Sequence, residues 1–285
     1  MTNNNYENAL QVLNLSKKFN EFQLDDVSFI LPAGYIMGLV GKNGAGKTTT
    51  INLILDLIKK DSGVINIFDE NTEGKSEFKD EIATVFDDTF FSSDWTAIDI
   101  EKAIGPFYSK WDSNTFHNYL KQFSLSSKKK VKELSKGMKM KMMLAVALSH
   151  NAKLLILDEP TSGLDPVARD ELMDILLDYM ESGEASVLFS THITDDLEKI
   201  ADYITLMKDG KVFYTGPKDD LVESYFVVQG KISEIYPEFE NLVIGLRKTS
   251  TGFSCLMNIK DIATLKTNMV TEKATIDDIL IYINK

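Results

Sequence analysis

Short apolar runs alternate with longer amphipathic segments along most of the chain. Apolar runs with the length and composition of β-strands occupy residues 35–40, 64–68, 83–86, 154–157, 187–189 and 204–207. Segments with helical spacing occupy residues 47–58, 138–148 and 166–180. This alternation predicts a parallel sheet with helices packed against it. The run 154–157 is apolar throughout, which is typical of a strand buried on both faces.

Other patterns add elements to this α/β core. A turn at Asp209-Gly210 separates strand 204–207 from a further strand at 212–214, which predicts a hairpin because Asp-Gly favours positive φ. Strand-like runs near residues 9–15 and 24–31 predict an added antiparallel sheet.

Two regions differ from the core in pattern. Residues 88–150 contain few β-branched residues, many lysines and helical spacing, so we predict a mostly helical insert there. Residues 221–285 contain short strand-like runs and end in a helix near Ile276–Ile283. We predict that this tail forms a small module of its own.

The composition narrows the class of protein. The chain has 285 residues, of which 44 % are hydrophobic and 26 % charged, and this balance is ordinary for a globular protein. The polar start and the lack of an apolar run near the ~20 residues of a membrane helix predict neither a signal peptide nor a membrane span. The single cysteine, Cys255, precludes an intrachain disulfide, and its apolar neighbours favour a packing role.

The net charge of −12 disfavours duplex DNA and anionic lipid as general partners. The charge is uneven, because residues 88–150 carry +4 and residues 221–285 carry −1. The rest of the chain carries −15. A lysine run around residues 128–141 is interpreted as a solvated face that adds some electrostatic steering toward anionic partners, whether a small ligand, an acidic protein or lipid headgroups.

Residues 41–48 have the sequence Gly-Lys-Asn-Gly-Ala-Gly-Lys-Thr and match the pattern G-x-x-x-x-G-K-[ST] between a strand and a helix. The glycines allow positive φ and leave no Cβ in the way, so successive backbone N–H groups can converge on phosphate oxygens. The helix N-terminus adds positive potential there. We expect Lys47 to neutralise the β- and γ-phosphates and the Thr48 hydroxyl to ligate Mg²⁺.

A pair of carboxylates follows the buried strand at 154–157. Asp158 stands at the carboxyl end of this strand and can hold Mg²⁺ through water, while Glu159 can accept a proton from an attacking water. Ligands of such sheets bind at the carboxyl ends of the strands, so both motifs can meet one nucleotide. Lys47, Mg²⁺ and Glu159 together would supply charge stabilisation and water activation for phosphoryl transfer.

Further motifs single out a family. Residues 134–138 are Leu-Ser-Lys-Gly-Met before a helix, residues 162–165 are Ser-Gly-Leu-Asp, and His192 follows strand 187–189. With the phosphate loop and Asp158-Glu159-Pro160, they stand in the order found in ATP-binding cassette (ABC) ATPases, which the chain resembles from about residue 9 to residue 220.

The resemblance implies a P-loop NTPase (RecA-like) α/β core with an antiparallel β subdomain, a helical subdomain and a short C-terminal α+β module. We expect the cassette to span residues 1–220, with its helical subdomain at about 88–150. The accessory module would span residues 221–285.

The resemblance also implies roles for individual residues. Phe19 resembles the aromatic residue that stacks on adenine, for which a core position is the alternative. Ser135 and Gly137 resemble the signature that binds the γ-phosphate of ATP held by a second subunit. Asp165 resembles the residue that joins the two sites, and His192 resembles the switch histidine that contacts the γ-phosphate and positions water.

These roles define the expected site. The catalytic set is Lys47, Glu159 and His192. The ATP-contacting set is Phe19, Gly41, Asn43, Gly44, Ala45, Gly46, Lys47, Thr48, Thr49, Ser135, Gly137 and Asp165. The Mg²⁺ set is Thr48, Asp158 and Asp87.

The chain departs from the family pattern at three positions. Family members usually carry Gln about 40 residues after the loop lysine, where this chain has Asp87. Asp accepts hydrogen bonds but cannot donate as an amide does, and it adds negative charge beside the phosphates. In the signature, Lys136 replaces the common Gly and Met138 the common Gln.

The resemblance implies an ATPase subunit that dimerises, with itself or with a second cassette, around two ATP molecules and drives a separate membrane permease. We expect it at the cytoplasmic face of the cell membrane, held there by the permease, and we expect no nucleic-acid partner. The phosphate loop and the tail most resemble exporters of drugs or amphipathic peptides, including phenol-soluble-modulin exporters.

Two other functions stay open at this point. One is a cassette ATPase that acts on ribosomes or nucleic acid, although such proteins usually have two fused cassettes or a long coiled coil, and only 88 positions separate Lys47 from Ser135 here. The other is a small-molecule kinase, which would give no reason for Glu159 and His192 together.

In ABC ATPases, the region that corresponds to Phe90, Phe91 and Trp95 bears the groove for a helix of the permease. The resemblance therefore implies such a groove here, with burial of these residues in the insert as the alternative.

Overall fold

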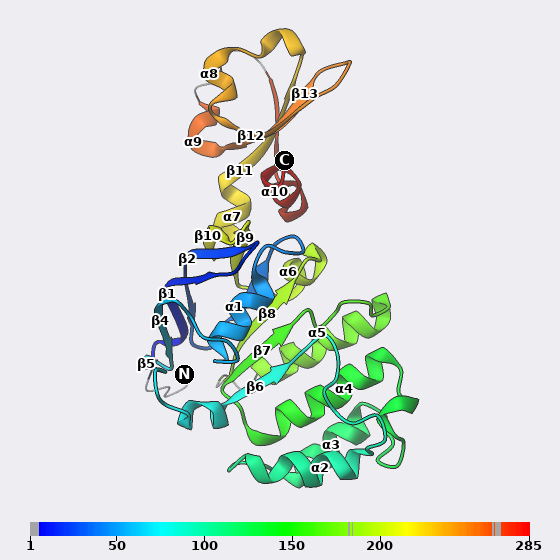
Figure 1. Cartoon of the computed structure of the whole chain (residues 1–285). Coiled ribbons are helices and arrows are strands. Elements are labelled where there is room, and N and C mark those ends of the chain that lie inside the picture. The colour runs from blue at the N-terminus through cyan, green and yellow to red at the C-terminus, as the bar shows by residue number, and fades with distance from the viewer. Residues whose placement is uncertain (1–5, 182, 184, 264, 266–268) are drawn as a thin grey trace.

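The centre of the molecule is a sheet of strand order β10-β9-β3-β8-β7-β6 (Figure 1). The structure, a computed structural model, describes residues 6–181, 183, 185–263, 265 and 269–285. The strands are β3 (Ile36–Val40), β6 (Ile82–Val85), β7 (Leu154–Asp158), β8 (Ser186–Thr191), β9 (Tyr203–Lys208) and β10 (Lys211–Pro217). All pairs are parallel except β9 and β10, which form the predicted hairpin, with positive φ at Asp209 (48°) and Gly210 (79°).

Both faces of this sheet are covered. In β8, Val187 and Phe189 point into one hydrophobic cluster and Leu188 into the other, because side chains alternate across a strand. The helices α5 (Pro166–Met180) and α6 (Thr194–Ile200) pack in the first cluster, and α1 (Lys47–Ile54) packs in the second. The uniformly apolar run at 154–157 thus marks a buried strand, as predicted.

An antiparallel sheet covers the second cluster (Figure 1). Its order is β2-β1-β4-β5, and its strands are β1 (Asn8–Lys18), β2 (Gln23–Pro32), β4 (Ser62–Ile67) and β5 (Glu70–Asn71). The runs near 9–15 and 24–31 predicted this added sheet. The run 64–68 was wrongly counted with the parallel sheet, because β4 pairs antiparallel with β1.

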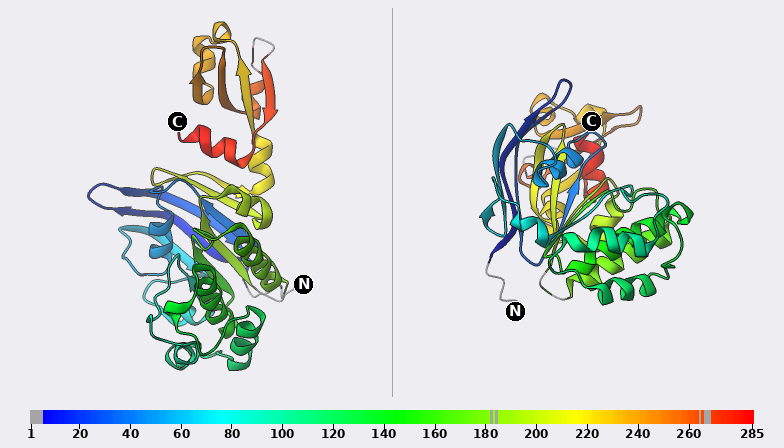
Figure 2. Two further views of the ribbon diagram at one scale, coloured as in Figure 1. Left: turned by 90° about the vertical axis from the view of Figure 1, so that its right-hand side faces the viewer. Right: turned by 60° about the horizontal axis from the view of Figure 1, so that its bottom comes forward.

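The insert is helical, as predicted, and projects from the edge of the central sheet (Figures 1 and 2). Its helices are α2 (Ala97–Ile104), α3 (Ser113–Gln122) and α4 (Lys136–Ala147). Short 3₁₀ turns flank them at Gly105–Phe107, Val131–Glu133 and Leu148–His150, and another turn, Glu77–Glu81, precedes β6.

Two helix boundaries differ from those predicted, one because of a side-chain cap and one because of a left-handed residue. The Ser135 hydroxyl accepts a hydrogen bond from Met138 N (3.3 Å), so α4 begins at Lys136 rather than at 138. Helix α1 ends at Ile54 rather than at 58, because Asp56 turns to φ 56°.

The C-terminal residues form a separate small sheet joined to the cassette by α7 (Lys218–Ser224). The sheet has the order β12-β13-β11-β14, with β11 (Tyr225–Gly230), β12 (Val243–Lys248), β13 (Phe253–Asn258) and β14 (Val270–Lys273). A 3₁₀ turn (Ile232–Glu234) and the helices α8 (Pro237–Glu240), α9 (Ile259–Ile262) and α10 (Ile276–Ile283) complete it. Figure 2 shows this module at one end of the molecule, away from the helical insert.

Cys255 belongs to the hydrophobic cluster of this module, together with Phe239 and Phe253. Burial raises the pKa of its thiol to about 12, so the thiol stays protonated and acts as a small apolar side chain. This agrees with the packing role expected from its neighbours. In the part of the chain that the structure describes, no helix has both the length and the apolarity to cross a membrane.

Candidate nucleotide site

The predicted motifs meet at the carboxyl ends of three adjacent strands. β3 leads into the phosphate loop, β7 ends at Asp158, and β8 leads to His192. Because β8 lies between β3 and β7, the segments that follow these strands converge on one edge of the sheet. A cavity of about 660 Å³ opens there. It is lined by Glu21, Phe22, Asn43, Gly44, Gly46, Lys47, Thr48, Thr49, Asp87, Glu159, Ser162 and His192.

The phosphate loop has the backbone that its glycines permit. Gly44 has φ 84° and Gly46 has φ 110°, conformations that L-residues with a Cβ rarely adopt. Gly46 is the N-cap of α1, so the unpaired N–H groups of the first helical turn face the loop. Thr48 lies in this turn and lines the cavity. The loop therefore offers backbone donors and a hydroxyl to an anion.

Lys47 is held firmly. Its side chain is 5 % exposed, and its Nζ donates to the carbonyl oxygen of Gly41 at 2.8 Å. The same Nζ lies 3.1 Å from Oε1 of Glu159. The ammonium is thus buried with partners already in place, as a buried charge requires.

Glu159 contacts both the phosphate loop and His192. One carboxylate oxygen contacts Lys47, and the other lies 2.6 Å from Nδ1 of His192. His192 is 42 % exposed and faces the cavity, whereas Glu159 is 16 % exposed. The contacts Lys47–Glu159–His192 place a cation, a carboxylate and an imidazole in one row along the cavity.

The backbone at the end of β7 is fixed by Ser190 of β8. The N–H of Glu159 donates to Ser190 Oγ at 2.9 Å, and this hydroxyl donates to Asp158 Oδ1 at 2.5 Å. Glu159 itself has φ 50°, a strained conformation for a residue other than glycine. Such strain persists where surrounding contacts impose it, and here Ser190 supplies them.

The protein oxygens at this site could bind Mg²⁺ only together with the phosphates of a nucleotide. Among the described residues, no group of three or more His, Cys, Asp or Glu side chains is arranged to hold a metal ion. Mg²⁺ commonly takes one or two protein oxygens, waters and substrate phosphates, and prefers not to sit in a protein cage. Asp158, buried and oriented by Ser190, and the exposed hydroxyl of Thr48 fit that pattern.

Other predicted residues lie outside this cavity. Ser135 is exposed at the start of α4, and Gly137 lies against Leu164 and Ala168 near the start of α5. Asp165 caps α5 by accepting from Val167 N and Ala168 N, both at 3.0 Å. Phe19, Gly41, Ala45 and Asp158 also do not line it. The signature and the phosphate loop of one chain are therefore separate surfaces.

Sequence reasoning missed several residues at this site. Phe22 lines the cavity near Gly46, whereas Phe19 is 42 % exposed, with the two ring centroids 6.3 Å apart. Ser162 also lines the cavity, three positions before the predicted Asp165, which does not. The sequence could have indicated Phe22, because it is the second aromatic residue in the short stretch 19–22. No local pattern indicates Ser190, since its role depends on the pairing of β8 with β7.

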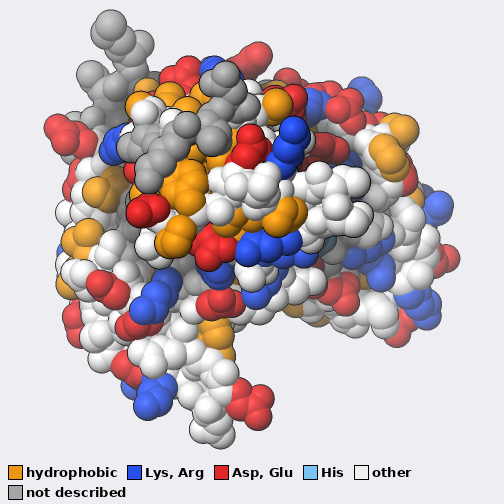
Figure 3. Space-filling view, turned by 90° about the horizontal axis from the view of Figure 1, so that it is seen from above, with side chains coloured by type: hydrophobic (Ala, Val, Ile, Leu, Met, Phe, Trp, Pro, Cys, Tyr) orange, Lys and Arg blue, Asp and Glu red, His pale blue; other side chains and the backbone are white. Residues whose placement is uncertain are grey.

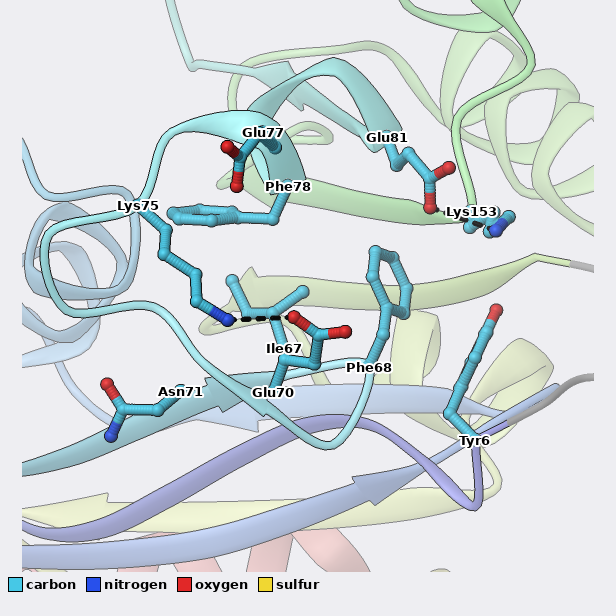
Figure 4. Close-up of a pocket in the computed structure, with 10 residues that line it drawn as sticks. All are labelled: Tyr6, Ile67, Phe68, Glu70, Asn71, Lys75, Glu77, Phe78, Glu81 and Lys153. Atoms are coloured by element: carbon cyan, nitrogen blue, oxygen red, sulfur yellow. Dashed lines mark hydrogen bonds and ion pairs between the residues drawn. The ribbon is translucent and has the colours of Figure 1, made fainter.

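A second cavity of about 340 Å³ lies apart from these motifs (Figure 4). The rings of Tyr6, Phe68 and Phe78 line it, together with charged side chains. The charges are largely paired with one another, as in the Lys75–Glu70 (2.9 Å) contact shown there.

Comparison with known proteins agrees with this geometry. The sequence model of the family described as "ABC transporter" matches residues 24–162. The energy-coupling factor transporter ATP-binding protein EcfA2 of Clostridioides difficile (strain 630) is 30 % identical over 272 residues, 91 % of this chain and 93 % of that protein. The chain belongs to the ABC transporter family.

Two further relatives have transport in their names. The bacitracin transport ATP-binding protein BcrA of Bacillus licheniformis is 32 % identical over 74 % of this chain and 71 % of its own length. The lantibiotic transport ATP-binding protein SrtF of Streptococcus pyogenes is 32 % identical over 71 % of this chain and 88 % of its own. A solved ATP-binding subunit of an ABC transporter has a TM-score of 0.68 at 28 % identity, covering 75 % of this chain and 91 % of that one.

Membership settles the general function. This chain is an ATP-binding subunit of an ABC transporter and an ATPase, with the predicted P-loop NTPase fold. The alternative role on ribosomes or nucleic acid is not favoured, since these relatives are transporter subunits.

Proposed function

We propose that this ABC transporter subunit hydrolyses ATP at a site shared between two cassettes. The observation that carries the proposal is the row Lys47–Glu159–His192 along the cavity, with the signature on a separate surface. Ser135 and Gly137 of one cassette would bind the γ-phosphate of ATP held in the other.

Each residue of the row has a distinct task in this scheme. The loop N–H groups and Lys47 would bind the phosphates, Glu159 would take the proton of the attacking water, and His192 would orient that water. Mg²⁺, when bound, would neutralise phosphate charge. Thr48, Asp158 and Asp87 would hold it, the two carboxylates through water.

The partner would be a membrane permease, which places the chain at the cytoplasmic face of the membrane. A groove of about 180 Å³ in the helical insert supports this, because Phe90 (61 % exposed) and Phe107 (82 % exposed) stand at it while Phe91 is buried. An exposed apolar groove suits an amphipathic helix of the permease. The names of BcrA and SrtF favour a drug or a peptide as cargo, exported from the cell.

The substitution Glu159→Gln tests this mechanism. The amide keeps the size of the side chain but cannot take a proton, so ATP turnover should fall by about 100-fold or more. ATP binding should persist, and gel filtration with ATP should show a stable dimer. Wild-type turnover in a strictly monomeric protein would contradict the shared site.

Asp165→Asn is a suitable control for the fold. The amide oxygen still accepts from Val167 N and Ala168 N, so α5 keeps its cap. Nucleotide affinity of the single chain should stay within about twofold of wild type, because Asp165 lies outside the cavity.

A further inference from the structure

The last helix, α10, joins the C-terminal module to the cassette. Its buried side chains Ile276, Ile279 and Ile283 belong to the same hydrophobic cluster as Leu197 and Ile200 of α6. The module's own core, around Cys255, forms a different cluster. Figures 1 and 2 show α10 at the base of the module, on the side toward the cassette. Its apolar face is therefore shared with the helix that follows His192.

Two hydrogen bonds also join α10 to the cassette. Thr194 Oγ1 donates to Asp277 Oδ1 at 2.6 Å, across 83 positions of sequence. Thr194 is the first residue of α6, is 6 % exposed, and stands two residues after His192. At the other end of α10, Lys208 Nζ donates to the carbonyl oxygen of Ile283. The module thus contacts the cassette beside the catalytic row.

The segment 191–196 is anchored within the cassette as well. Thr191 Oγ1 accepts from Ile193 N at 3.0 Å and lies 3.2 Å from Asp196 Oδ2. The buried Asp196 also accepts from Thr161 Oγ1 at 2.6 Å. The bond from Thr161 thus ties Asp196 to the cassette, and the pairing of Thr191 with Val40 of β3 ties the other end of the segment, whereas Thr194 is held from the module.

We propose that Asp277 is a positioning residue for ATP hydrolysis, which acts through Thr194 on the segment that carries His192. A hydrogen bond to a carboxylate is stronger than one between neutral groups, so this bond restrains Thr194 well. Small displacements of a catalytic group reduce the rate of chemistry more than they reduce binding. The C-terminal module thereby sets the turnover of bound ATP. This inference rests on the proposed role of His192.

The test measures ATP turnover and affinity on the full chain. Asp277→Ala should lower kcat about threefold to tenfold and leave KM for ATP within twofold, since one charge-assisted hydrogen bond is lost and the phosphate loop is untouched. Asp277→Asn should restore most of the rate, because its amide oxygen still accepts from Thr194. Glu272→Ala, an exposed carboxylate on β14 of the same module, is the matched control and should behave as wild type.

Variants of Thr194, the donor of this hydrogen bond, test the proposal independently. Thr194→Val removes the hydroxyl at nearly constant volume and should reproduce the loss, and Thr194→Ser should rescue it. The double variant Thr194→Val with Asp277→Ala should lose no more than either single variant, because both remove the same bond. Thermal unfolding of each variant shows that the chain is folded.

The outcomes separate this inference from the mechanism on which it rests. If His192→Ala hydrolyses ATP at the wild-type rate, the proposed role of His192 fails, and the inference fails with it. If His192→Ala is inactive while folded Asp277→Ala and Thr194→Val keep wild-type kcat, only the inference is overturned. Losses that multiply in the double variant, or a rise of KM without a fall in kcat, also overturn it.

Discussion

At the scale of single residues, two phenylalanines are candidates to stack on the adenine of ATP. Phe22 lines the cavity near Gly46, and Phe19 lies beside it with Lys17 Nζ 5.9 Å from its ring centroid. A base can stack on either ring, because stacking needs only an aromatic face. Phe19 is 42 % exposed, so part of its ring is open to a base despite Lys17, while Phe22 packs against the phosphate loop.

We therefore expect Phe19 to stack on adenine and Phe22 to support the loop. Phe19→Ala should weaken ATP binding about tenfold, as loss of one stacked base does, and Phe19→Tyr should bind as wild type. Phe22→Ala should cost less affinity. Equilibrium binding of a fluorescent ATP analogue checks this, and the reverse order of losses would place adenine on Phe22.

The residues of the site differ in how far sequence could predict them. Lys47, Thr48 and Glu159 follow from fixed spacing at strand ends, and the structure places them at one cavity. Ser190 and Asp277 act through contacts between elements distant in sequence, so no local pattern marks them.

At the scale of elements, apolar periodicity predicted the central strands well because both sheet faces are buried. Helix ends were less predictable. The end of α1 depends on the left-handed conformation of Asp56, and the start of α4 on the Ser135 cap. Such local backbone events leave weak traces in hydropathy, since a cap and a mid-helix serine have the same polarity.

The joint between the helical insert and β6 contains a buried histidine. His150 is fully buried, its Nε2 lies 3.2 Å from the carbonyl oxygen of Ile82, and its ring stacks on Tyr108 with centroids 3.8 Å apart. Burial lowers the pKa of His150, because the charged imidazolium is poorly solvated there. The neutral form is thus the one that the fold accommodates.

This predicts a loss of stability in mild acid. The unfolded histidine takes a proton near pH 6.5 and the folded one only at lower pH, so stability is full above 6.5 and falls as pH drops below it. The loss is about 1.4 kcal/mol for each unit by which the pKa is lowered. Urea unfolding at pH 7 and pH 5 should show a larger loss for wild type than for His150→Gln.

His117 supplies the control for that comparison. Its side chain is 52 % exposed, so His117→Gln should keep the wild-type loss between pH 7 and pH 5. If His150→Gln loses as much stability as wild type, the titrating group is elsewhere.

At the scale of the whole molecule, charge is distributed by region. Acidic and basic side chains are interspersed on the face seen from the module end (Figure 3). Two lysines of residues 88–150 pair with acidic residues outside that range, since Lys141 contacts Glu171 at 2.6 Å and Lys110 contacts Glu81 at 2.9 Å. The +4 of residues 88–150 thus overstates the free positive charge of the insert, and apolar contact becomes more important for its partner surface.

The groove at Phe90 and Phe107 gives the last prediction. Replacing both with serine removes exposed apolar surface without opening a core, so ATP turnover of the isolated chain should stay within about twofold of wild type. Binding to the permease should fall strongly, because exposed aromatic residues at a groove supply much of the binding energy of a docked helix. The measurement is the fraction of the chain that sediments with membranes from the source cells. Leu57→Ser, at a position 61 % exposed after α1, is the matched control and should sediment as wild type. Full sedimentation of the double variant would show that the permease binds another face.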